Sequence, residues 1–275
     1  MKKSKFGYLW NILIAIILIA GVILLLYPTV SDYWNSFHQS KAITSYAEKV
    51  ETLEEAAYDQ MMKEAKAFNA SILERDNVYK LTEEEEARYH ELLDLSGLGV
   101  MGYVEVPLLN CSLPIYHGTS DSVLQVAIGH IEWTSLPVGG KSSHCVISGH
   151  RGLPRAKLFT DLDKMAVGDV FMLRTLDEVL TYEVDQISIV KPQDTKKIEI
   201  VEGEDYCTLV TCTPYGINSH RLLVRGHRIE NIDARTVFVT ADAIQIDPVL
   251  VAPIVAVPIL MGMLVWLLVK TRKKR

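Results

Sequence analysis

Two long uncharged apolar runs constrain this chain most, because about 20 such residues can cross the hydrocarbon core of a bilayer. The runs cover residues 8–28 and 249–269 of a 275-residue chain. The first is too long for the apolar part of a typical signal peptide, and no small-x-small cleavage site follows it. Pro253 and Pro258 lie inside the second run, and membrane helices tolerate proline better than soluble ones. We therefore expect two transmembrane helices.

The basic residues that flank these runs predict their orientation. Residues 1–7 hold three lysines, and residues 270–275 hold five Lys or Arg. Because positive residues favour the cytoplasmic side, we expect two cytoplasmic tails on a multi-pass protein of the cell membrane. The extracytoplasmic middle part holds all 34 acidic residues and 20 of the 28 basic ones, a net charge of −14. Such an acidic domain argues against a nucleic-acid partner.

Residues 31–98 follow the first run and have a helical pattern. Apolar residues recur at steps of three and four through residues 43–61, which predicts an amphipathic helix with one apolar stripe. Thr82 and Glu85 have the spacing of a capping box and predict a further helix that ends by Gly97.

The pattern changes to short β-rich runs over residues 99–230. Turns that contain Pro or Gly separate these runs, which predicts a closed or nearly closed β-barrel. We expect one short helix within residues 156–165 and a linker over residues 231–248 that returns the chain to the membrane. The β-rich runs are 101–109, 111–118, 144–150, 170–176, 180–190, 207–213 and 220–229.

The hairpin TLVTCTPYGINSHRLLVRG, residues 208–226, is the most informative stretch for chemistry. Strand parity places Val210 and Cys212 on one face, at the end of an apolar strand. Arg221 on the returning strand can lie across the hairpin from Cys212. An arginine is no general base, but it can favour a thiolate, bind a carbonyl group or stabilise an oxyanion.

A thiol nucleophile needs a proton partner, which is usually a histidine. His150 lies in a glycine-flanked loop directly after a hydrophobic strand, where rigid scaffolds present functional side chains. His117 and His130 also lie at strand–loop junctions, whereas His220 should point away from Arg221. We therefore favour His150 as the partner.

The four cysteines raise the question of disulfides and metal binding. Cys207 and Cys212 are five residues apart on one strand, so they face opposite sides and cannot bridge while the strand is regular. Cys111 could pair with Cys145, or all three remaining thiols could be small buried hydrophobes. We expect no metal and no cofactor, because common zinc-ligand spacings do not fit the candidates His144, Cys145, His150, Cys207 and Cys212.

Several stretches of the β section together carry a family resemblance. The pentapeptide TLVTC at 208–212, followed by Arg221, looks like the TLxTC…R signature of sortases, which are membrane-anchored transpeptidases of Gram-positive bacteria. The stretches 99–107, 113–140, 147–165 and 208–229 all resemble class C, the pilus-assembling sortases. The double membrane span with the enzyme between the two helices is similar to that class as well.

The resemblance implies a mainly β fold: a sortase-type eight-stranded β-barrel with an N-terminal helical section and a transmembrane helix at each end. It places the nucleophile at Cys212, the histidine at His150 and the arginine at Arg221. It implies a cysteine transpeptidase, akin to thiol proteases, that cleaves an LPxTG-like sorting signal between Thr and Gly through a thioester. The acyl product would then join a lysine amine of a pilin subunit in pilus assembly.

Other functions and one departure from the family also follow from the sequence. The alternatives are a sortase that anchors surface proteins to cell-wall peptide and a non-catalytic membrane-tethered binding module. Class C sortases commonly carry a lid with an Asp-Pro-aromatic motif, which residues 67–86 lack. Asp76 with Tyr79 is a candidate substitute for that motif at a different spacing. The simpler expectation is that this stretch is a surface loop between two helices.

Overall fold

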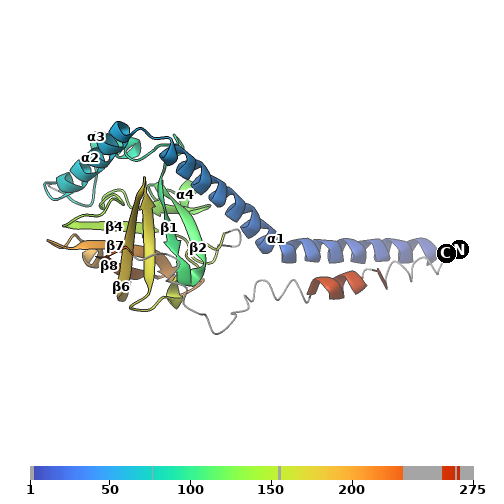
Figure 1. The fold of residues 1–275 in the computed structure, drawn as a ribbon. Coiled ribbons are helices and arrows are strands. Elements are labelled where there is room, and N and C mark those ends of the chain that lie inside the picture. The colour runs from blue at the N-terminus through green and yellow to red at the C-terminus, as the bar shows by residue number, and fades with distance from the viewer. Residues whose placement is uncertain (1–2, 76, 154–155, 232–255, 264, 267–275) are drawn as a thin grey trace. The chain divides into compact units, whose positions relative to one another are not determined.

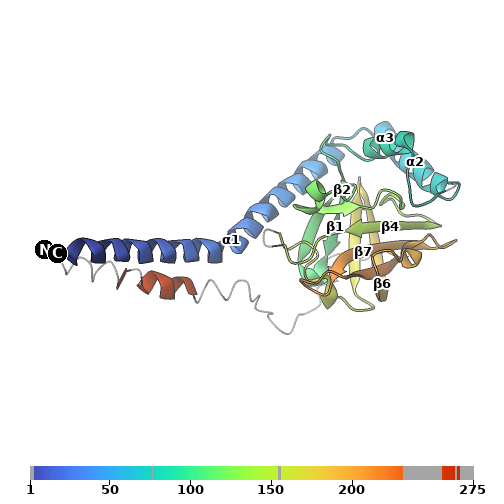
Figure 2. The same ribbon diagram turned by 180° about the vertical axis from the view of Figure 1, so that it is seen from behind.

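The computed structural model describes residues 3–75, 77–153, 156–231, 256–263 and 265–266 (Figures 1 and 2). The chain divides into two compact units, one of residues 1–34 with 241–275 and one of residues 35–240. The second unit contains the β-barrel and the helices α2 and α3.

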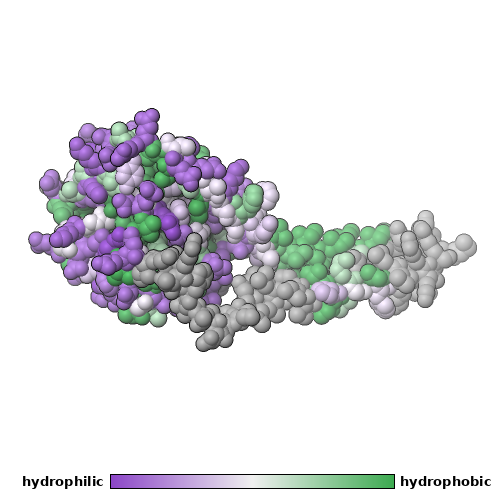
Figure 3. Space-filling model, viewed as in Figure 1, coloured by the Kyte–Doolittle hydropathy of each residue, from purple (hydrophilic) through white to green (hydrophobic). Residues whose placement is uncertain are grey.

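Helix α1 (Lys3–Glu51) contains the first predicted membrane span and has Pro28 inside it. Among the described residues it is the one helix long and apolar enough to cross a membrane, with a candidate span of Ile12–Glu51. That length and composition suit a membrane anchor or a signal segment, and Figure 3 shows its apolar surface. The second predicted span, 249–269, lies mostly outside the described residues, and its residues 256–263 are helical.

Helices α2 (Glu55–Ile72) and α3 (Glu83–Glu91) confirm the helical section but shift its boundaries. The apolar stripe through residues 43–61 is shared between α1 and α2. Thr52 lies at the break, where its hydroxyl donates to the carbonyls of Glu48 and Lys49 and competes with the backbone. The predicted capping box is confirmed by hydrogen bonds between Thr82 and Glu85 in both directions.

Helix α3 ends several residues before the glycines at which we expected it to end. The helix stops after Glu91 because Leu92 has extended backbone angles, φ −71° and ψ 132°, and Leu93 then has φ 63°, in the left-handed region. The expected helix within residues 156–165 is a single 3₁₀ turn, η2 (Leu162–Lys164). The remaining short helices are η1 (Pro107–Leu109), α4 (Asp121–Leu124) and η3 (Lys196–Ile198).

Eight strands close into a barrel in the order β1-β2-β3-β4-β7-β8-β6-β5, which confirms the predicted barrel. The pairs β2–β3 and β4–β7 are parallel and the others are antiparallel. Strand β3 was not among the β-rich runs because it is only three residues long. The strands are β1 (Val100–Val106), β2 (Cys111–His117), β3 (Ile128–His130), β4 (Ser143–Ser148), β5 (Val170–Thr175), β6 (Glu178–Val190), β7 (Asp205–Thr213) and β8 (His220–Ile229).

The hydrophobic core fills the barrel and continues under α2 and α3. Alternate residues of neighbouring strands, such as Ile147, Leu209 and Val224, are completely buried. Burying a side chain of this size stabilises the fold by roughly 1.5–3 kcal/mol. Phe68 of α2 and Tyr89 of α3 belong to the same cluster, so these helices are part of the folded domain.

Candidate active site

Cys212 and Arg221 face each other across the β7–β8 hairpin. The two residues are direct partners in the antiparallel register, as the hairpin pattern predicted. Both side chains are partly exposed. The guanidinium of Arg221 donates from Nη1 to the carbonyl oxygens of Asn218, at 3.3 Å, and His220, at 3.2 Å. These bonds hold the cation at the end of the hairpin that carries the thiol.

His150 follows β4 by two residues and continues the alignment of β4 with β7. The parallel register pairs Ser148 with Val210. Beyond it, the amide of Gly149 donates to the carbonyl of Val210 at 3.0 Å, and the hydroxyl of Thr211 donates to the carbonyl of Gly149 at 2.8 Å. Extending this register by two residues brings His150 level with Cys212. Cys212 and Arg221 are therefore cross-strand partners, and His150 lies in the loop that continues β4 toward that pair.

The loop that carries His150 is fixed by close packing. A Cβ at position 149 would lie 2.7 Å from side-chain atoms of both Ile128 and Phe159, so only glycine fits there without a shift. The amide of Phe159 also donates to the carbonyl of His150 at 3.2 Å. The backbone of this loop is thus anchored on both sides of the histidine.

The outer face of the same sheet carries an apolar cluster beside Cys212. Strand parity separates Val210, in this cluster, from Leu209, which points into the barrel core. The buried members of the cluster are Val146, Ile198, Val210 and Leu223, and Ile131, Trp133 and Val190 pack against them. Cys212 therefore lies beside a second apolar cluster, which is separate from the barrel core.

Comparisons with known proteins agree with this geometry. A family profile described as "Sortase domain" matches residues 104–229. The crystal structure of sortase C1 from Streptococcus agalactiae is 48% identical with a TM-score of 0.68, and the match covers 70% of this chain and 100% of that one. The chain belongs to the sortase family.

Two further relatives are similar to this sortase. The crystal structure of sortase C from Streptococcus pneumoniae is 45% identical with a TM-score of 0.63, over 70% of this sortase and 97% of that chain. Sortase D of Bacillus subtilis is 29% identical over 131 residues, which cover 46% of this sortase and 63% of that protein. The match therefore spans somewhat less than two thirds of that curated relative's length.

The other histidines that competed for a functional role have structural partners in this sortase. His130 is fully buried, and its ring bonds the hydroxyl of Tyr89 through Nδ1 and the carbonyl of Ser135 through Nε2. His117 lies against the carbonyls of Gly99 and Leu92. Unlike these two buried rings, His150 is partly exposed.

His144 was considered only as a zinc ligand, yet it supports the outer face of the sheet. Its Nε2 lies 2.7 Å from the hydroxyl of Thr208, and its Nδ1 lies 2.8 Å from the carbonyl of Glu199. Burial lowers the pKa of His144 to about 4, so the ring is neutral at physiological pH. It therefore links β4, β7 and the segment that follows η3.

The cysteines occur as four free thiols with different surroundings. Cys207 is buried in the core and Cys212 is partly exposed, which confirms that they face opposite sides of β7. Burial raises the pKa of Cys111 to about 12, so its thiol is a poor nucleophile. Strand β3 separates the strands of Cys111 and Cys145, so these two residues are not neighbours.

The residues weighed for a zinc site do not come together. Cys145 and Cys207 lie in the barrel core, whereas His144 bonds Thr208 on the same face of β7 as Cys212. Within the ranges described above, no group of three or more His, Cys, Asp or Glu side chains can hold a metal ion.

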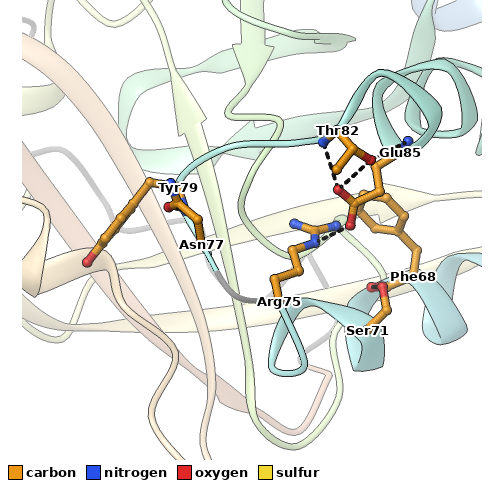
Figure 4. Close-up of polar contacts among 7 residues, drawn as sticks. All are labelled: Phe68, Ser71, Arg75, Asn77, Tyr79, Thr82 and Glu85. Atoms are coloured by element: carbon orange, nitrogen blue, oxygen red, sulfur yellow. Dashed lines mark hydrogen bonds and ion pairs between the residues drawn. The ribbon is translucent and has the colours of Figure 1, made fainter.

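The loop between α2 and α3, which Figure 4 shows with Tyr79, contacts the barrel, a feature that sequence reasoning largely missed. The ring of Tyr79 meets that of Trp133 edge-on, with centroids 5.2 Å apart, and its hydroxyl donates to Glu199 at 2.6 Å. Trp133 packs against the outer-face cluster, so its contact with Tyr79 joins the loop to this face of the barrel. Asp76, its proposed companion in a lid, lies outside the described residues.

An ion pair joins the two ends of this loop. The Nε of Arg75 donates to Glu85 at 2.8 Å, and the same carboxylate accepts from the backbone of Thr82 (Figure 4). The hydrogen bonds from Thr82 and Arg75 lower the pKa of the Glu85 carboxyl. Burial raises it by less, so the net effect is a lowered pKa. The carboxylate therefore stays ionised and holds the loop base together.

Proposed function

We propose that this sortase is a class C enzyme that joins pilin subunits, with Cys212 as nucleophile, His150 as acid and base, and Arg221 as oxyanion donor. The observation that carries the proposal is the pairing of Cys212 with Arg221 across β7 and β8, with His150 in the loop that follows the neighbouring strand β4. The similarity to sortase C structures supports the class, and the Streptococcus pneumoniae structure among them is described as informative about pilin substrate specificity.

The first half of the reaction cleaves the sorting signal. The Cys212 thiolate attacks the carbonyl carbon of the signal's Thr, and Arg221 stabilises the negative charge on the carbonyl oxygen. The bond between Thr and Gly breaks, and the leaving Gly amine takes a proton from His150. The product is a thioester between Cys212 and the substrate.

The second half transfers the acyl group to the acceptor. A lysine amine of the next pilin subunit, already neutral after losing one proton to solvent, attacks the thioester carbonyl, and His150 takes the second proton from its nitrogen. The Cys212 thiolate leaves as the isopeptide bond forms, which restores the starting enzyme.

We also propose that α1 anchors this domain outside the membrane. Protease added to intact protoplasts should then remove residues 35–230, and protection of this domain would contradict the orientation.

The test combines a product assay with variant kinetics. The full chain in detergent is incubated with a sorting-signal peptide and either a pilin domain or a cell-wall peptide, and products are identified by mass. We expect an isopeptide product with the pilin domain, no product from Cys212→Ala, and near wild-type activity from the matched control Cys111→Ala. Product with the wall peptide alone would instead identify a wall-anchoring sortase.

Variants of the other two residues separate their roles. Arg221→Lys keeps the charge but loses the planar fork, so we expect a loss of about 2–4 kcal/mol in transition-state stabilisation, mostly in kcat. His150→Ala should remove the acid–base limb of the pH profile. An Arg221→Lys enzyme with wild-type turnover would contradict the oxyanion role.

A further inference from the structure

Two buried thiols lie opposite each other on the two strands that lead to His150 and Cys212. Cys145 of β4 and Cys207 of β7 are direct partners in the parallel register. Their exposed fractions are 2% and 0%, and both belong to the barrel core. Each precedes a candidate catalytic residue by five positions, Cys145 before His150 and Cys207 before Cys212.

The register meets the geometric requirement for a disulfide. Neighbouring strands lie about 4.7–4.9 Å apart, and disulfides join residues whose Cα atoms are about 4.4–6.8 Å apart. Because Cys145 and Cys207 are partners on the same face of the sheet, their side chains point the same way. The register therefore places the two residues within the Cα separation that disulfides span.

The surroundings of the pair make Cys145 the more reactive of the two thiols. Burial opposes ionisation of Cys145, but its interactions with Cys207 and His130 outweigh burial and lower the pKa of this thiol. Burial raises the pKa of Cys207. Cys145 is therefore the better attacking thiolate of the two.

We propose that Cys145 and Cys207 form a disulfide that ties β4 to β7 when the domain meets a small-molecule or protein disulfide as oxidant. The Cys145 thiolate attacks one sulfur of the oxidant and displaces a first thiolate. Cys207 loses its proton and attacks the mixed disulfide at the Cys145 sulfur, which displaces a second thiolate. Two protein thiols are oxidised and one oxidant disulfide is reduced to two thiols. The pairing does not depend on the proposed function.

The disulfide would stabilise the barrel because it closes a long loop. The crosslink removes closure entropy from the unfolded chain, and it joins residues about 60 positions apart. For a domain of this size the expected rise in melting temperature is roughly 10 °C. The crosslink would also fix the spacing of the two strands that carry His150 and Cys212.

The test is peptide mapping of the full chain in detergent after incubation with a mixture of oxidised and reduced glutathione. The incubation is run near the onset of melting, where the core opens transiently. A parallel sample with N-ethylmaleimide sets the time at which both buried thiols are labelled. Trypsin then releases residues 142–151, which hold Cys145, and residues 198–221, which hold Cys207 and Cys212.

We expect these two peptides to be linked in the wild type and in Cys212→Ala, and separate in Cys207→Ala. The rise in melting temperature should be absent from Cys145→Ala and Cys207→Ala. If the maleimide labels both thiols but glutathione never links the two peptides, the proposal is wrong. It is also wrong if the link disappears in Cys212→Ala, because Cys145 would then pair with the nucleophile.

Discussion

Replacing Thr211 by Val tests how the fold positions His150. Thr211 is 1% exposed, and its hydroxyl donates to the carbonyl of Gly149, the residue before the histidine, at 2.8 Å. Valine has nearly the same shape but no donor, so the buried carbonyl loses its partner. A buried acceptor without a partner costs about 1–3 kcal/mol, and we expect Thr211→Val to lose about 2 kcal/mol of unfolding free energy.

Catalysis should fall as well, because His150 is held through this bond. A displacement of about 1 Å in a reacting group can cost on the order of 100-fold in rate. The amide of Gly149 still donates to Val210 in the variant, so we expect a smaller loss of about 10-fold in kcat with little change in KM.

The assay pairs denaturant unfolding with steady-state kinetics on a sorting-signal peptide. Thr211→Ser keeps the hydroxyl and is the matched control, with near wild-type stability and turnover expected. The positioning argument fails if Thr211→Val keeps wild-type kcat, or if Thr211→Ser is as impaired as Thr211→Val. A stable Thr211→Val enzyme with wild-type unfolding free energy would show that Gly149 finds another donor.

Two further predictions concern the loop and the buried histidine. Tyr79→Ala removes a hydrogen bond and an aromatic contact, so we expect about 10-fold faster alkylation of Cys212, with a smaller effect in Tyr79→Phe. Equal rates in all three proteins would show that Tyr79 does not cover the thiol. The folded-state pKa of His144, about 4, lies below the usual value of 6.5. Between pH 6.5 and 4, His144 is therefore protonated in the unfolded chain but stays neutral in the folded chain. The unfolding free energy should fall by up to about 3 kcal/mol as the pH is lowered from 6.5 to 4. His144→Gln should lack this loss, and an unchanged slope would refute the assignment.

The features that follow local rules could be predicted from the sequence. Strand parity and a single turn fix which residues meet in a hairpin, and this is why the partnership of Cys212 with Arg221 is confirmed by the register. The capping box of Thr82 and Glu85 is likewise local, because its bonds span one turn of helix. The length and apolarity of residues 8–28 also predicted a long helix there, and α1 contains this segment.

The tertiary structure decided what depends on long-range register. The partnership of Cys145 with Cys207 comes from a parallel pair whose strands are separated by β5 and β6 along the chain, and no local pattern reports that alignment. The same alignment sets His150 level with Cys212, whereas sequence reasoning chose His150 from its loop and from the family resemblance. The contact of Tyr79 with Trp133 and Glu199 joins three loops, so only packing could reveal it. Local rules thus determined which side of a strand each residue faces, and closure of the barrel determined which residues it meets there.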